Sequence, residues 1–243
     1  MKEPLMNSKS NVLHDKEASG WEDKYKTTYF QDRLLNYQKW LDSYSIETSA
    51  ERCIRALDIG CGTFPSSPLF QKHNLSAVGV DTSKNMVDAA HRLNRNAILY
   101  DGVNLPFESG VFSFISMINT IQFVTQPLEL LTEIRRVSKP EATLFMTIAN
   151  YNSLIKRLIK LFKGASYGTL PEWHSTYTVL SLAELIIPLG FSSPKIFSYS
   201  LPTLYNRAPL LLGAPIFRNR YFADNIYLEI KIKSNENESP RKP

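Results

Sequence analysis

Two closely spaced glycines follow a short apolar segment and are candidates for binding a ligand through the backbone. The segment runs from Arg55 to Ile59 and leads into Gly60, Cys61 and Gly62, with the carboxyl group of Asp58 two residues before the first glycine. Glycine at the end of a strand lets the chain turn sharply, and it lets a ligand approach where a Cβ would block it. The pattern predicts a nucleotide-binding turn. The alternative is a turn that needs glycine only for its positive φ angles.

An acidic residue ends the next apolar segment, at the distance expected for binding a ribose. The segment is Ser76–Asp81, and Asp81 lies 19 residues beyond Gly62. A carboxylate at this place can accept two hydrogen bonds from a ribose diol. Thr82 or Ser83 then offers an N-cap for a following helix. An isolated Asp81 would be read as a helix-capping residue, so its register with Gly62 carries the prediction.

These segments resemble the class I S-adenosylmethionine-dependent methyltransferases. The first motif of that family reads D-x-G-C-G-x-G, and this chain matches it from Asp58 but has Phe64 in place of the last glycine. The dinucleotide pattern G-x-G-x-x-G would need glycine where Pro65 stands. Gly79–Met86 is similar to the second motif of the family. The resemblance implies S-adenosylmethionine as cofactor and S-adenosylhomocysteine as product.

The resemblance also implies a role for each matching residue. Asp58 is expected beneath the methionine amino group, Asp81 on the ribose, Asp101 and Gly102 at the adenine, and Asn119 beside the sulfonium. The residues that the resemblance places in the cofactor site are Asp58, Gly60, Cys61, Gly62, Asp81, Thr82, Met86, Asp101, Gly102 and Asn119. Metal binding is not expected, because no Cys/His cluster has zinc-site spacing.

The elements that must position these residues alternate along the chain. Strands are expected at 54–59, 76–81, 96–102, 111–118, 143–149, 193–200 and 225–233. Helices are expected at 21–44, after Pro65, from 82–87 onward, at 128–137 and at 180–191. Residues 138–142 resemble the turn that precedes the fifth strand in the family. The implied fold class is α/β, a Rossmann-like, seven-stranded, mostly parallel sheet with helices on both faces. An N-terminal helical extension and a helical insert after the fifth strand complete it.

The domain organisation follows from these elements. We expect a loose lead over 1–17, a helical cap and linker over 18–49, a methyltransferase domain over 50–234 and a disordered tail over 235–243. Within the domain, 150–178 is an insert on the acceptor side. The aromatic residues of 21–44 fit helices that cover the cofactor and substrate, as in the family. They equally fit plain packing in the core.

The insert contains a basic amphipathic segment at 153–163. On a helical wheel its six apolar side chains fall on one face and its four cations on the other. Residues 203–222 are also apolar and cationic. Such segments are typical of a membrane surface or of anionic-ligand binding, and the alternative is a surface helix packed on its own domain. We therefore expect a hydrophobic or anionic small-molecule acceptor, with peripheral membrane contact through both segments.

A base for the methyl acceptor is harder to identify. Methyl transfer gains most of its rate from positioning, and an O–H or N–H nucleophile can also need a general base. His174 is the histidine of the insert and the first candidate, and Tyr177 is the second. The alternative for His174 is hydrogen bonding or packing.

Composition bounds the remaining classes. The 243 residues are 43% apolar and 21% charged, as in a globular protein. An apolar leader and a membrane span are not expected, and Cys53 and Cys61 fit reduced thiols in the cytoplasm. Nucleic acid is an unlikely partner, because the basic region is interleaved with aliphatic rather than stacking side chains. Two other classes stay open: a non-catalytic cofactor-binding scaffold or partner subunit, and a nicotinamide-dependent oxidoreductase.

Overall fold

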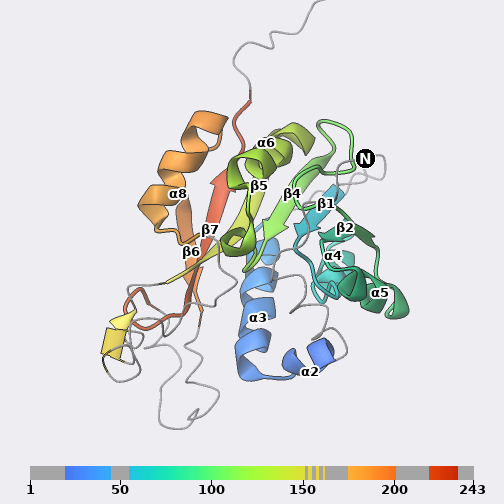
Figure 1. Ribbon diagram of the computed structural model, residues 1–243, viewed down its shortest axis with the longest axis horizontal. Helices are drawn as coiled ribbons and strands as arrows, with labels where there is room; N and C mark the ends of the chain where they lie inside the picture. Colours follow the sequence, from blue (N-terminus) through green and yellow to red (C-terminus); the bar gives the residue numbers. More distant parts are fainter. Residues whose placement is uncertain are drawn as a thin grey trace, which may run out of the picture.

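A seven-stranded sheet forms the centre of the molecule (Figure 1). The computed structural model describes residues 20–44, 55–150, 153–154, 157–158, 161, 175–200 and 219–234. The strands are β1 (Arg55–Ile59), β2 (Ser76–Asp81), β3 (Ala97–Leu99), β4 (Phe112–Met117), β5 (Ser138–Ala149), β6 (Lys195–Tyr199) and β7 (Asn225–Lys231). Their order is β3-β2-β1-β4-β5-β7-β6, with β1 to β5 parallel and β7 antiparallel to both of its neighbours. The predicted fold class is confirmed.

Helices cover both faces of the sheet. They are α2 (Trp21–Lys24), α3 (Thr28–Asp42), α4 (Ser67–Lys72), α5 (Lys84–Arg92), α6 (Pro127–Val137) and α8 (Val179–Ile186), with 3-10 turns η2 (Ile121–Phe123) and η3 (Ile187–Leu189). Side chains of α6 and α8 share one apolar cluster with the sheet, and those of α3, α4 and α5 share another. Since parallel strands need crossover connections, this doubly wound arrangement buries the sheet on both sides.

The helix α3 packs directly on the sheet. The indole of Trp40 is fully buried and stacks on Phe145 of β5, with ring centroids 4.5 Å apart. Tyr37 stacks on the same ring at 5.7 Å. Aromatic pairs at these separations add to the stabilisation that burial gives. Tyr37 and Trp40 of α3 therefore pack in the core, as in the alternative interpretation of this segment.

The start of β5 differs from the sequence prediction. Residues 138–142 were expected to form only a turn, yet β5 begins at Ser138, which pairs with Phe112 of β4. Glu141 has φ 62°, and the register shifts between Phe112 and Phe114, so the strand contains an irregularity rather than a preceding turn. The Glu141 N–H donates to the Ile232 carbonyl at 3.0 Å, which keeps the irregular segment paired with the β7 side.

The ends of α8 and β3 also differ from the sequence prediction. The helix expected over 180–191 changes to a 3-10 turn after Ile186, where Pro188 has no N–H to continue the helix. Gly190 then ends the segment with φ 87°, as the sequence predicted. On the other side of the sheet, β3 stops at Leu99, because the chain turns at Asp101.

Candidate active site

The glycine turn lies where β1 ends and is held against β2. The N–H groups of Gly60 and Cys61 both donate to the Val80 carbonyl, at 2.8 and 3.1 Å. Gly60 has φ 69° and Gly62 has φ 56°, values that favour glycine. A Cβ on Gly60 would also overlap the side chain of Thr120. Glycine is therefore required at position 60 by both conformation and space.

The structure brings Asp81 to this turn. Its carboxylate accepts hydrogen bonds from the N–H of Gly62 at 2.7 Å and of Ser83 at 2.9 Å. Ser83 in turn caps α5, because its hydroxyl oxygen accepts from the Met86 N–H at 3.2 Å. The register between Gly62 and Asp81 that the sequence suggested thus corresponds to a direct contact. The ribose role of Asp81 stays a prediction.

Asp58 lies in β1 beneath the turn and is 5% exposed. Its two oxygens accept hydrogen bonds from Ser66 at 2.5 Å and Ser116 at 2.7 Å. Tyr37 donates to the hydroxyl of Ser116 and so extends this buried network to α3. Burial raises the pKa of Asp58 to about 6, although the two serines and the positive charge of Arg33 act to lower it. The Asp58 carboxyl therefore keeps its proton to a higher pH than an ordinary aspartate does, because its pKa is raised.

We expect the Asp58→Asn variant to gain about 2 kcal/mol of stability, relative to the unmutated protein, as pH rises from about 4 to 7. The folded pKa of about 6 exceeds the ordinary value of 3.8, so the folded protein binds more protons in this window and its stability falls as they are released. Urea unfolding of both proteins at several pH values measures the difference. Asp88→Asn, at an exposed acid on α5, is the control and should show no such gain. A constant difference across pH would contradict the prediction.

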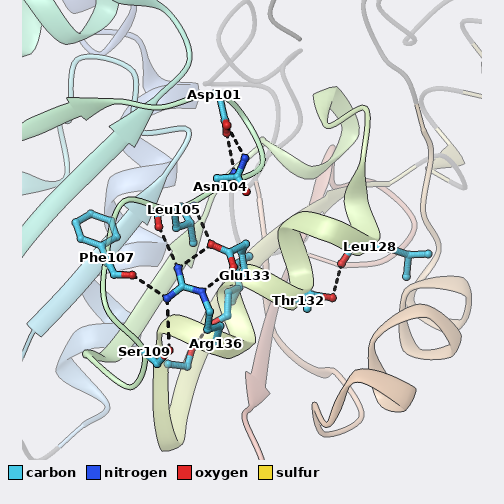
Figure 2. Close-up of polar contacts among 11 residues, drawn as sticks. Asp101, Asn104, Leu105, Phe107, Ser109, Leu128, Thr132, Glu133 and Arg136 are labelled. Atoms are coloured by element: carbon cyan, nitrogen blue, oxygen red, sulfur yellow. Dashed lines mark hydrogen bonds and ion pairs between the residues drawn. The ribbon is translucent and has the colours of Figure 1, made fainter. Parts of the chain in front are cut away.

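The loop after β3 is held by the side chain of Asp101. The carboxylate accepts hydrogen bonds from the N–H groups of Val103 and Asn104 at 2.9 and 2.7 Å, and from the Asn104 amide at 2.6 Å (Figure 2). Burial acts to raise the pKa of Asp101, but these donors outweigh it and the pKa is lowered. Asp101 thus shapes its own loop, and its contact with adenine stays a prediction. Gly102, with φ 92°, completes the turn.

Two residues of α6 hold the rest of this loop, and the sequence analysis missed both. Arg136 donates to the carbonyls of Leu105 and Phe107 at 3.0 and 2.8 Å (Figure 2). Glu133 accepts from the Leu105 N–H at 3.0 Å and pairs with Arg136 at 2.6 Å. An i,i+3 charge pair was visible in the sequence of the helix. Nothing in that pattern indicated that the pair binds a loop about 30 residues earlier.

Three further residues of the predicted cofactor set lie around the turn. Cys61 is 5% exposed, and a Cβ on Gly79 would stand 2.5 Å from its sulfur, so the thiol packs against the backbone of β2. Burial raises the pKa of Cys61 well above its usual value. Thr82 lies beside Gly102, whose added Cβ would meet the Thr82 methyl group at 3.4 Å. Met86 is 1% exposed, so its side chain belongs to the packing under this edge.

Asn119 ties the end of β4 to β5. Its N–H donates to the Thr147 hydroxyl at 2.7 Å, and that hydroxyl donates to the Asn119 amide oxygen at 2.7 Å. Asn119 has φ 53°, a conformation that asparagine tolerates better than most residues. The contact fixes Asn119 at the sheet edge that also carries the glycine turn. Its place beside the sulfonium stays a prediction.

The short helix α2 lies over the glycine turn. A Cβ on Gly62 would stand 3.3 Å from the indole nitrogen of Trp21. Glu22 pairs with Arg95 at 2.9 Å and also accepts a hydrogen bond from the Thr63 hydroxyl at 2.5 Å. Arg95 donates in addition to the Thr63 carbonyl at 2.8 Å. This Glu22–Thr63–Arg95 contact fixes α2 above the place where the cofactor is expected.

Replacing Glu22 with glutamine is expected to weaken S-adenosylhomocysteine binding about 5-fold, because a partly exposed ion pair and a hydrogen bond to the turn are lost together. Isothermal titration measures the affinity. Asp23→Asn is a matched control, since Asp23 is the next carboxylate of the same helix and forms an exposed ion pair with Lys26. Equal affinities of the two variants would show that α2 does not take part in binding.

A pocket of about 410 Å³ lies at the carboxyl end of β5. Its lining residues come from β5, β6 and β7, from the approach to β7, from the two ends of the insert and from the start of α8. They are Ile148, Ala149, Asn150, Leu154, Arg157, Tyr177, Thr178, Val179, Ile196, Tyr199, Arg220, Tyr221 and Ile226. The Asn119–Thr147 contact joins this end of β5 to the end of β4. Because β1, β4 and β5 are parallel, the pocket and the glycine turn share one edge of the sheet.

The acceptor-side predictions are only partly within the described residues. Tyr177 lines the pocket, whereas His174 lies outside them. Of 153–163, the structure describes five positions, among which Leu158 and Leu161 are 57% and 79% exposed. Of 203–222, it describes only 219–222, and Cys53 also lies outside. Membrane contact stays a prediction.

Within the described ranges no helix is long and apolar enough to cross a membrane. The same ranges contain no cluster of three or more His, Cys, Asp or Glu side chains that could hold a metal ion.

Comparison with known proteins identifies the domain. Residues 57–146 match the family model described as a methyltransferase domain. An uncharacterized protein of Methanocaldococcus jannaschii is 28% identical over 181 residues, which cover 68% of this chain and 82% of that protein. The demethylmenaquinone methyltransferase of Staphylococcus saprophyticus is 29% identical over 45% of this chain, and the match spans about half (53%) of that enzyme.

The fold is shared with solved methyltransferases. A SAM-dependent methyltransferase from Thermotoga maritima superposes with a TM-score of 0.67 and 19% identity, covering 92% of this chain and 99% of that one. A SAM-dependent methyltransferase from Archaeoglobus fulgidus gives a TM-score of 0.62 at 15% identity, over 87% and 97% of the two chains. The family match covers the glycine turn, Asp81 and the loop at Asp101.

Proposed function

We propose that this S-adenosylmethionine-dependent methyltransferase transfers its methyl group to a small-molecule acceptor that is hydrophobic or anionic. The observation that carries the proposal is the shared sheet edge, which has the Gly60–Gly62 turn with Asp81 at one place and the 410 Å³ pocket at another. Small-molecule sites have this size and mostly apolar lining. The matched quinone-pathway enzymes also act on small molecules by their names, which supports the same class.

The residues present suit the cofactor. The glycine turn has positive φ angles and no Cβ at positions 60 and 62, as a turn that contacts a nucleotide through its backbone requires, and a carboxylate stands at the end of β2 for a diol. In addition, Gln122 is 5% exposed, and its amide oxygen has no hydrogen-bond partner among the described residues. A buried acceptor without a donor is costly, so a ligand that supplies one is favoured there. Gln122 lies three residues after Asn119, in the 3-10 turn η2 that follows β4.

The side chains of the turn and the pocket would act by positioning the two substrates. When bound, S-adenosylmethionine supplies a methyl group on a sulfonium, which an in-line nucleophile can accept. Asp81 and the glycine turn would hold the nucleoside, and Asn119, fixed by Thr147, would border the reacting end. The pocket would align the acceptor with that end. Positioning of this kind supplies much of the barrier reduction in two-substrate reactions. Of the two candidates for the general base, Tyr177 is the one within the described residues, and it would accept the proton of the methyl acceptor.

Gln122→Met is expected to have two effects of opposite sign. The free energy of unfolding should rise by about 1 kcal/mol, because a buried oxygen without a partner is removed. The affinity for S-adenosylhomocysteine should fall about 5-fold, because the ligand loses that acceptor. Urea unfolding and isothermal titration measure the two quantities on the same preparation. A gain in stability with unchanged affinity would exclude Gln122 from the cofactor site.

Binding and transfer must be tested separately. We expect S-adenosylhomocysteine to bind the full chain with a Kd of about 1–100 µM, in the usual range for enzyme ligands. Methyl-labelled S-adenosylmethionine, incubated with a panel of hydrophobic phenols, amines and carboxylic acids, should then label at least one acceptor. Binding without transfer to any acceptor would favour the alternative, a cofactor-binding scaffold or partner subunit. Absence of binding would overturn the proposal.

A further inference from the structure

The charged residues of the pocket at the end of β5 indicate which chemical class of acceptor the pocket binds. Two of its lining residues are arginines, Arg157 and Arg220, and among the described residues that line it there is no aspartate or glutamate. The arginines come from segments far apart in the sequence, one from the start of the insert and one from the approach to β7. Two cations on one small cavity attract an anion, and the planar guanidinium suits carboxylate and phosphate.

The pocket separates an apolar interior from a cationic rim. Ile148 and Ala149, at the end of β5, are 1% and 7% exposed, and the partly buried Ile226 adds further apolar lining, whereas Ile196 is 48% exposed and lies nearer the surface. Both arginines are exposed at the surface, so their charges stand at the opening rather than at the base. An apolar body would thus be buried while a charged group stays at the rim. Three tyrosines in the lining suit a flat ring system.

The segment that carries Arg220 is fixed to the end of β5. The amide of Asn150 donates to the carbonyls of Arg220 and Ala223 at 2.8 and 2.9 Å, and the Asn150 N–H donates to the Asp224 carbonyl at 2.7 Å. The start of the insert joins the same segment, because the Leu154 N–H donates to the Tyr221 carbonyl at 2.5 Å. These hydrogen bonds join the two segments that carry Arg157 and Arg220.

The guanidinium of Arg220 is also oriented. It donates to the Tyr221 hydroxyl at 2.7 Å, and its central carbon lies 4.8 Å from the centre of the Tyr221 ring. A guanidinium that stacks and donates in this way loses less conformational freedom when it binds an anion. No acid is needed to hold it in place.

We propose that this pocket binds an acceptor with an apolar, ring-containing body and one anionic group, and that Arg157 and Arg220 bind the anion. The assignment rests on the proposed function, since it names the acceptor class of the same site. Carboxylate and phosphate share the chemistry that the arginines recognise, so both are used as probes. The residues act by binding and orienting the acceptor, and the chemistry of methyl transfer is unchanged.

The test uses the full chain and three probes of one shape: 2-naphthoate, 2-naphthyl phosphate and the uncharged 2-naphthamide. Isothermal titration is done with and without S-adenosylhomocysteine. We expect at least one anionic probe to bind about 10-fold more tightly than the amide, and this preference to fall to about 2-fold in the double variant Arg157→Gln/Arg220→Gln. Preference for the carboxylate or for the phosphate identifies the anion.

Two controls keep the result interpretable. Arg157→Lys/Arg220→Lys should retain part of the preference, and Arg92→Gln, at an exposed arginine of α5, should retain all of it. Equal binding of the amide and the anions, or an unchanged preference in the double glutamine variant, would overturn the proposal. So would failure of all three probes to bind a protein that binds S-adenosylhomocysteine, a result that leaves the proposed function standing. Failure of S-adenosylhomocysteine alone would count against the function, while the probes still decide the pocket.

Discussion

Replacing Gly60 with alanine is expected to destabilise the protein by about 3 kcal/mol and to abolish measurable cofactor binding. The backbone at Gly60 has φ 69°, and an added Cβ would overlap the side chain of Thr120. The Thr120 hydroxyl donates to the carbonyls of Ile59 and Ile118, at 3.2 and 3.1 Å, so the side chain cannot turn away without losing these bonds. Urea unfolding and titration with S-adenosylhomocysteine measure the two effects.

Gly110→Ala provides the matched control for this prediction. Gly110 has φ 67°, almost the same conformation as Gly60, but an added Cβ there would meet nothing within 4 Å. The control should therefore cost only the conformational strain of about 1–2 kcal/mol. The difference between the two variants reports the overlap with Thr120, and the second change Thr120→Ala should recover part of it. Equal losses at the two glycines would refute the steric argument.

Asp81→Ala is expected to weaken S-adenosylhomocysteine binding about 10- to 100-fold, which corresponds to about 1–3 kcal/mol. The variant removes the carboxylate predicted to bind the ribose, and it also leaves the N–H groups of Gly62 and Ser83 without their acceptor. The turn and the start of α5 should therefore loosen together. Isothermal titration measures the affinity, and hydrogen exchange of these amides reports the loosening.

A second variant separates the two roles of Asp81. Asp81→Asn keeps an oxygen that can accept from one N–H but places an amide donor where the other N–H points. We expect it to fold closer to the unmutated protein than Asp81→Ala does, while binding the cofactor almost as weakly. Asp88→Ala, at an exposed acid on α5, should change neither quantity. Full affinity in Asp81→Asn would contradict the ribose role.

The cofactor half of the site could be predicted because its signals are local. Two glycines after an apolar strand and an acid at the end of the next strand follow from short segments, and the parallel order of β1 and β2 brings them together. The same reasoning fails at Glu141. Nothing in the residue type shows that it adopts φ 62°, so the strand irregularity at the start of β5 was read as a turn.

The contacts that hold the site were not predictable in this way. Glu22 and Arg95 are 73 residues apart, and the charged residues of α6 bind a loop about 30 residues earlier. Such pairs leave no periodic pattern in the sequence. A polar side chain on a surface segment can reach many partners, and the tertiary structure decides which one it contacts. The pocket is a further example, since Arg157 and Arg220 line it together although 63 residues separate them in the sequence.

The sheet order also means that the strands on the two sides of the sheet are synthesised at different times. The strands β1 to β4, which carry the glycine turn and Asp81, leave the ribosome before β6 and β7 and can pair among themselves. In contrast, β6 pairs only with β7, which inserts between β5 and β6 after both have been synthesised. N-terminal segments become available first during synthesis, whereas a domain generally folds as one unit. The strands that carry the glycine turn are therefore made before those that line the acceptor pocket, and the complete sheet requires β7.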